Sequence, residues 1–170
     1  VWTSPKNAVV ICEALCARLC QIDPAHEEVF RANCVAYCEE LRALDAAFRE
    51  VVDNGSGSCL IFADRFPVRY FVEEYGLEYY AAFPGCADDT EPSARTVAFL
   101  IDRVRDEQVP AVLVIEYSDG KMARVIAEDT GCEICRFHSC HTVSSADMEA
   151  GENYLSLMWE NVESIREALG

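Results

Sequence analysis

The sequence predicts an α/β fold: a four-stranded, mainly parallel sheet with helices on both faces, preceded by a helical hairpin. From residue 56 onward, short apolar runs alternate with amphipathic segments, which is typical of strands joined by crossover helices. Before residue 56, two helical segments are separated by only an Asp-Pro step. The 170 residues are enough for one well-buried core.

The predicted hairpin begins at Ser4-Pro5, an N-cap residue followed by a proline in the first helical turn. Its first helix is expected to run to about Gln21. Asp23-Pro24 repeats the signal and opens a longer helix, whose apolar residues roughly follow helical spacing and which is expected to end near Asn54-Gly55. The two helices therefore form a hairpin that turns near residue 22.

The later elements follow in the order expected of a parallel sheet covered on both faces. Gly76 and Gly131 are expected to end two of the helices, and Ser118 is expected to cap another. The predicted strands are 59–63, 77–83, 111–117 and 133–137. The predicted helices are 66–76, 94–108, 119–131 and roughly 151–168.

Composition argues against several classes of function. The formal net charge is −16, and the 14 Lys and Arg residues are scattered, which argues against a nucleic-acid partner because phosphates attract basic patches. No apolar run is long enough to span a membrane, and no signal peptide is visible. Because the first residues lead directly into a helix, we expect the chain to be a piece of something longer.

Ten cysteines are a high number for a chain whose apolar content can form a core without disulfides. Cys12, Cys16 and Cys20 share one helix face, and Cys34 and Cys38 share a face on the partner helix. We expect most of these to be small buried residues at a close helix contact. Pairings of Cys20 with Cys34 and of Cys16 with Cys38, both centred on residue 27, stay open because only Cα distances decide them.

Residues able to bind metal stand where the predicted strands end. Ligands of open α/β sheets bind beyond the carboxyl ends of the strands. Carboxylate, thiolate and imidazole groups are the metal-binding side chains of proteins. The sequence therefore predicts a divalent-metal site at this edge of the sheet. Its candidate ligands are Asp64 after the first strand, Glu116 at the end of the third, and His138, Cys140 and His141 after the fourth.

Each candidate also has a purely structural interpretation. Asp64 can serve as an N-cap, and Glu116 can position the loop before the next helix. His141 is favoured as a support of a ligand rather than as a ligand itself. Cys86, which follows the second strand, can pair with Cys140 in a disulfide if the protein is exported.

The segment 132–141, CEICRFHSCH, can also be written C-x2-C-x2-H-x2-H, as in a zinc ribbon. Cys132 and Cys135 are an odd number of residues apart beside or within a strand, so their side chains should face opposite sides, which argues against a structural zinc site. The C-x-x-C sequence precedes a strand instead of opening a helix, which argues against thioredoxin-type chemistry. Dinucleotide, P-loop and nucleophile-elbow motifs are absent.

Several segments carry a family resemblance. They are VWTSPKNA at the start, IDPAHEEVFRANCVAYCEELRALDAAFRE, YFVEEYGLEYYAAF, EPSARTVAFLIDRVRDEQVPAVLVIE, and NYLSLMWENVESIREAL at the end. In order and spacing, nearly the whole chain resembles the C-terminal half of the zinc- and manganese-type solute-binding proteins of bacterial ABC transporters. The first segment resembles one that directly follows a metal-ligating histidine in that family.

The resemblance implies a non-enzymatic protein that captures a divalent transition metal, Zn2+ before Mn2+, and delivers it to an ABC transporter permease in the membrane. It implies an extracellular place, as a cell-surface lipoprotein or periplasmic protein. It also implies that half of the metal site is present, so weak binding or none is expected. The implied units are 1–22, a remnant helix of the N-terminal lobe; 23–55, the helix linking the lobes; 56–150, the C-terminal α/β lobe; and 151–170, the closing helix.

Two family ligands carry over to this sequence. One stands at Asp64 if the first strand sets the alignment, or at Arg65 if the count runs back from RYF (69–71). The other stands at His138 in RFHS. Two alternatives stay open: a metal-dependent hydrolase with Asp64 and His138 as ligands and Glu116 as base, or a thiol redox domain built on loop 132–141.

Overall fold

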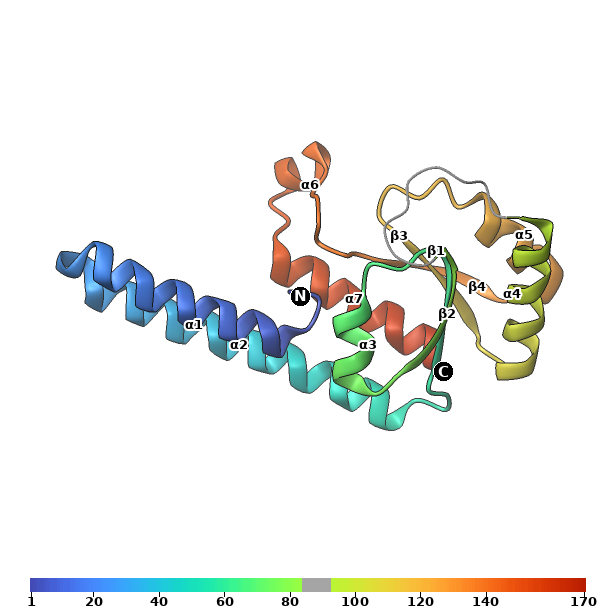
Figure 1. Cartoon of the computed structure of the whole chain (residues 1–170), viewed down its shortest axis with the longest axis horizontal. Coiled ribbons are helices and arrows are strands. Elements are labelled where there is room, and N and C mark those ends of the chain that lie inside the picture. Colours follow the sequence, from blue (N-terminus) through green and yellow to red (C-terminus); the bar gives the residue numbers. More distant parts are fainter. Residues whose placement is uncertain (84–92) are drawn as a thin grey trace.

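A computed structural model describes residues 1–83 and 93–170. Figure 1 shows a long arm of two antiparallel helices that leads into a sheet with helices on both faces. The arm consists of α1 (Pro5–Ile22), a 3-10 turn (Pro24–His26) and α2 (Glu27–Asn54). The Ser4 side chain accepts a hydrogen bond from the backbone N–H of Asn7, which confirms the predicted N-cap.

The sheet has the strand order β2-β1-β3-β4, and each of these neighbouring pairs is parallel. The predicted four-stranded parallel sheet is therefore confirmed. The strands are β1 (Cys59–Arg65), β2 (Glu78–Phe83), β3 (Ala111–Ile115) and β4 (Glu133–Phe137). The helices that follow the arm are α3 (Arg69–Tyr75), α4 (Ala94–Glu107), α5 (Lys121–Thr130), α6 (Ser145–Ala150) and α7 (Tyr154–Leu169).

Two apolar layers sandwich this sheet, which confirms the prediction of helices on both faces. Alternate residues of a strand point to opposite faces, so Phe62 joins the layer under α2, α3 and α7, and Ile61 joins the layer under α4 and α5. The first layer also contains Phe48, Phe71 and Phe137, all fully buried. The sheet is thus rigidly held on both sides, and only its strand ends are available for a site.

Local signals set most helix ends where they were expected. Gly76 and Gly131 end α3 and α5 in the left-handed conformation, with φ of 67° and 79°. The expected N-cap Ser118 was wrong: α5 starts after Gly120, and the Ser118 hydroxyl accepts a hydrogen bond from the Gly120 N–H at 3.1 Å. This hydrogen bond forms a Ser-turn before the helix, so the Ser118 hydroxyl does not cap the first turn of α5.

Two predicted helices are shorter in the structure. The helix predicted over 66–76 begins only at Arg69. Pro67 disfavours helical backbone at Phe66, and Val68 is the non-helical N-cap residue. The closing helix begins at Tyr154, after the Asn153 N-cap, and Gly151 ends the separate helix α6, which the sequence did not predict. Among the described residues, no helix combines the length and apolarity needed to cross a membrane.

The arm turns where the sequence predicted, and its thiols contact the facing helix in pairs other than the two disulfide pairings left open. The Cys16 thiol donates to the carbonyl of Phe30 at 3.6 Å, and the Cys34 thiol donates to the carbonyl of Cys12 at 3.7 Å. Both pairs are centred on residue 23, not 27, because the chain turns at Asp23-Pro24. The nine cysteines in the described ranges are all free, so neither open hairpin pairing is formed; Cys86, the proposed partner of Cys140, lies outside the described residues.

Candidate metal centre

A cavity of about 280 Å³ lies beyond the carboxyl ends of the central strands. β1 pairs with β2 on one side and with β3 on the other, so the chain changes direction across the sheet between β1 and β3. Such a switch point is where open α/β sheets bind ligands. The residues lining the cavity are Arg65, Pro67, Ile115, Glu116, Tyr117, Ser139, His141 and Thr142.

Glu116, which directly follows β3, holds the loop after β4. One carboxylate oxygen accepts a hydrogen bond from the backbone N–H of Ser139 at 2.7 Å, and the other accepts one from the Ser139 hydroxyl. The structural interpretation that Glu116 positions the loop next to it in sequence is therefore corrected: it positions the neighbouring strand's loop. Each carboxylate oxygen keeps a second lone pair, so Glu116 can still bind an ion.

His141 lies on the same cavity and contacts the start of the chain. Its ring stacks on the ring of Trp2, with centroids 5.9 Å apart and an interplanar angle of 20°. The Trp2 indole N–H donates to the carbonyl of Ser139 at 3.1 Å, and the Ser139 hydroxyl accepts the His141 N–H at 3.3 Å. Residues 139–141 are thus fixed between the N-terminal segment and Glu116, which makes His141 a well-positioned imidazole.

His138 is held by α7 instead. Its N–H donates to the Asn161 side-chain oxygen at 2.7 Å, and its carbonyl accepts from the Asn161 amide at 2.8 Å. The His138 side chain is 12% exposed, and Nε2 lies 3.0 Å from a carboxylate oxygen of Glu160. A carboxylate on one imidazole nitrogen is the arrangement that orients metal-ligating histidines, and it leaves Nδ1 for a ligand.

Cys140 does not join this group, because its thiol packs against the core. Its φ of 54° turns the backbone there, and Sγ lies 3.8 Å from the carbonyl of His138. Burial, and to a smaller extent the charge of Glu116, raises the pKa of the Cys140 thiol to about 12. Cys140 is also absent from the residues that line the cavity.

Asp64 lies inside β1, not after it. β1 pairs with β2 through Phe62 and Ala81 and again through Arg65 and Phe83, so one extra residue forms a bulge between these pairs. This bulge brings Arg65 to the cavity wall, the position that counting back from residues 69–71 indicated. Asp64 accepts the Arg65 N–H on Oδ1 at 2.7 Å, while its buried Oδ2 has no hydrogen-bond partner among residues 1–83 and 93–170.

The structure therefore brings two predicted ligands, Glu116 and His141, to one cavity, with Asp64 directly before its lining residue Arg65. Within the described ranges, no three metal-ligating side chains are already grouped around one point. The supporting residues Trp2, Asn161 and Glu160 were not singled out from the sequence. Of these three, only Asn161 could have been found from the sequence, because it is a polar residue among the apolar positions of the closing helix, between Met158 and Val162.

The redox alternative gains no support from the described cysteines. Cys132 contacts the layer under α4 and α5, whereas Cys135 is buried in the layer under α7, so the pair faces opposite sides as predicted. Burial, followed by the hydrogen bond to Glu167, raises the pKa of the Cys135 thiol to about 12. Redox-active cysteines require the opposite shift. Cys86 lies outside the described residues.

Comparisons with known proteins give related sequences along the whole chain. A family model described as zinc-uptake complex component A, periplasmic (ZnuA), matches residues 1–168. The zinc-binding lipoprotein AdcA of Streptococcus pneumoniae is 28% identical over 167 residues, which cover 98% of this chain and 33% of AdcA. The iron-binding protein YfeA of Yersinia pestis is 27% identical over 172 residues, 99% of this chain and 54% of YfeA.

Solved structures agree with these sequence relatives. The Zn(II)-bound ZnuA-like domain of S. pneumoniae AdcA superposes with a TM-score of 0.83 at 26% identity, covering 99% of this chain and 62% of that one. The metal-dependent lipoprotein YcdH of Bacillus subtilis has a TM-score of 0.85 at 24% identity, covering 99% of this chain and 63% of YcdH, which shows a shared fold. The chain thus spans about a third of AdcA and about three fifths of its zinc-binding domain.

Proposed function

The chain belongs to the ZnuA family of zinc-uptake components, and on this premise we propose that it is part of a solute-binding protein that captures a divalent transition metal for an ABC transporter. Zinc is the favoured cargo and manganese the second choice. The proposal includes delivery to a membrane permease and a place outside the cytoplasmic membrane, as a lipoprotein or periplasmic protein. The relatives AdcA and YfeA support it by their zinc- and iron-binding descriptions.

The observation that carries the proposal is the cavity at the β1–β3 switch point, which Glu116 and His141 both line. We propose these two residues as ligands contributed by this chain, with Asp64 and His138 at its margins. The unpaired buried Oδ2 of Asp64 and the Glu160-bound ring of His138 support their inclusion. Imidazole with carboxylate suits zinc and is also accepted by manganese.

Arg65 lines the cavity wall, and its guanidinium Nε lies 3.9 Å from the Asp64 carboxylate. Because few ligand groups are assembled by the described residues, this chain is expected to bind metal weakly by itself. The remaining ligands would come from the part of the relatives that this chain does not match. We therefore place the tight site in a longer protein and only one wall of it here.

Binding without turnover is the favoured activity. A metal-dependent hydrolase would need a free general base near an open coordination position. Glu116, the base of that alternative, already accepts two hydrogen bonds from Ser139, which favours a fixed positioning or ligand role. A hydrolase would reveal itself by metal-dependent cleavage of simple esters or phosphates.

The test is a calorimetric titration of the full-length, metal-stripped protein with zinc and with manganese. Zinc is expected to bind one-to-one, and His141→Ala and Glu116→Gln are each expected to weaken it by more than about 10-fold, the loss that even indirect ligand support produces. His138→Ala and Asp64→Ala should weaken it as well. Full affinity in all four variants would remove this site assignment.

The matched control is His26→Ala. Besides His138 and His141, the chain has one other histidine, His26. It lies at the tip of the arm, and its side chain is 64% exposed. Its removal should leave zinc affinity unchanged. If His26→Ala weakens binding as much as His141→Ala does, the effect is general surface binding by imidazoles, and the proposed site fails.

A further inference from the structure

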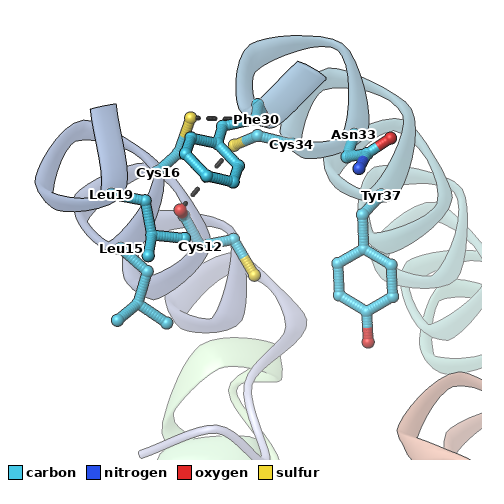
Figure 2. A pocket seen from close by; sticks show the side chains of 8 residues that line it. All are labelled: Cys12, Leu15, Cys16, Leu19, Phe30, Asn33, Cys34 and Tyr37. Carbon is cyan, nitrogen blue, oxygen red and sulfur yellow. Dashed lines mark hydrogen bonds between the residues drawn. The ribbon is translucent and has the colours of Figure 1, made fainter. Parts of the chain in front are cut away.

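The arm carries a row of four thiols that the proposed transport function does not use. Cys16 on α1 and Cys34 on α2 line the same two surface hollows, and Cys20 lies one helical turn beyond Cys16. Cys34 Sγ in turn lies 3.9 Å from Cys38 Sγ. The row crosses from α1 to α2 between Cys16 and Cys34, whose sulfur atoms are drawn in Figure 2. It lies on the arm, away from the strand ends (Figure 1).

Two surface hollows of about 270 Å³ each give access to this row from opposite sides. Cys16 and Cys34 line both of them. The first hollow, shown in Figure 2, is otherwise mainly apolar, with Leu15, Leu19 and Phe30 among its walls. The second is bordered by Arg31 and Arg42. The two central thiols are therefore reachable by a small solute.

The present partners of these thiols are weak. Cys16 and Cys34 donate to the carbonyls of Phe30 and Cys12 at 3.6 and 3.7 Å, and each of these carbonyls belongs to a helix. Thiol donors form weak hydrogen bonds, and a helical carbonyl inside a helix already accepts a backbone N–H. A ligand that replaces these contacts leaves no backbone group without a partner.

We propose that Cys16 and Cys34 form a binding site for a soft monovalent cation of the Cu(I) class. Thiolates select soft ions. Structural zinc takes four ligands in a tetrahedron, and the described residues offer no preassembled group of three. A pair of thiols suits instead an ion that accepts two ligands. Binding breaks two S–H bonds, forms two Cu–S bonds and releases two protons to solvent, with no electron transferred.

The charged residues around the pair are ion-paired with one another. Arg31 pairs with Glu27, and Arg42 pairs with Glu13, which lines the second hollow beside it. Their charges largely cancel, so the choice of ion rests on the two thiolates, which select soft ions. Binding should weaken as the pH falls, because each thiol must lose its proton to bind the ion.

The test is an anaerobic competition titration of the reduced chain with Cu(I) held by a chromogenic chelator. The unmodified protein should withdraw Cu(I) from the chelator, and Cys16→Ser and Cys34→Ser should each lower the affinity more than about 10-fold. The double variant should lose the site. Circular dichroism of each variant checks that the arm stays helical.

Cys132→Ser is the matched control, because it removes one partly exposed thiol beside the sheet. It should leave Cu(I) affinity unchanged. Undiminished binding by the Cys16→Ser, Cys34→Ser double variant, or equal loss in Cys132→Ser, would overturn the proposal. His141→Ala should leave the Cu(I) affinity unchanged, so the Cu(I) site is tested independently of the proposed zinc site.

Discussion

The arm and the lobe, which comprises the sheet and helices α3 to α7, are stabilised by different contacts. In the lobe, large aromatic side chains such as Phe62, Phe71 and Phe137 are fully buried between layers. In the arm, four of the five buried residues of α2 lie in its second half, beside the lobe, and many apolar residues of the two helices are exposed. These exposed residues are Val10, Ile11, Leu15, Leu19, Ile22, Val29 and Val35. Burial stabilises the lobe, whereas close contact between two helices holds the outer arm.

Cysteine has different roles in the arm and in the lobe. In the arm, small thiols let the two backbones approach and stay partly accessible, as with Cys16 and Cys34. In the lobe, Cys59 and Cys135 are buried core residues. The same residue type is therefore a reachable surface group in one region and an inert apolar group in the other.

The largest expected effect is Phe71→Ala in the lobe. Phe71 is fully buried, and its ring lies 4.9 Å from the Phe48 ring and 5.1 Å from the Phe137 ring. Removing it should lower the free energy of unfolding by about 3–5 kcal/mol through lost burial and a cavity. Urea unfolding followed by circular dichroism measures this. A loss below about 1 kcal/mol would contradict the tight core.

Asn161→Leu should come next. Asn161 is fully buried and holds both the N–H and the carbonyl of His138. Without it, these groups lose partners, which costs about 1–3 kcal/mol for each buried group left unsatisfied. Asn33→Leu, the same change at an exposed position of the arm, should leave the unfolding midpoint nearly unchanged. Equal costs at both positions would break the distinction between arm and lobe.

Alkaline pH should weaken the lobe. Burial raises the pKa of Cys135 to about 12 and that of Cys59 to about 11, above the usual value of about 8.5. Between about pH 8.5 and 12 the unfolded chain loses these protons while the folded chain keeps them, so stability falls as pH rises, by up to about 1.4 kcal/mol per pH unit for each group. Urea unfolding between pH 8 and 10.5 measures the slope, which Cys135→Ala should reduce.

The smallest effects should come from the exposed surface of the arm. Arg42 and Glu13 form an ion pair across the two helices at 3.1 Å, and both side chains are 56% exposed. Arg42→Ala should cost less than about 1 kcal/mol and lose its effect at high salt. Leu15→Ala should stay within about 0.5 kcal/mol. A cost in the arm as large as that of Phe71→Ala would show that the outer helices rest on an apolar core after all.

Local signals in the sequence were enough to determine the fold. Apolar runs of strand length, the Ser4-Pro5 cap and the glycines at 76 and 131 gave the order of the elements, and β4 has the predicted bounds. These features act over a few residues, through backbone sterics and hydrogen bonds to neighbours in the chain. The sequence could therefore also place the candidate ligands at one edge of the sheet.

Only the tertiary structure decided which candidates meet. The bulge in β1 depends on pairing with β2, and it moves Arg65 to the cavity and keeps Asp64 in the strand. The positive φ of Cys140 turns its thiol into the core, while His141 stays at the cavity. Such contacts join residues distant in sequence, and a change of one residue in register reverses which side chain faces the site.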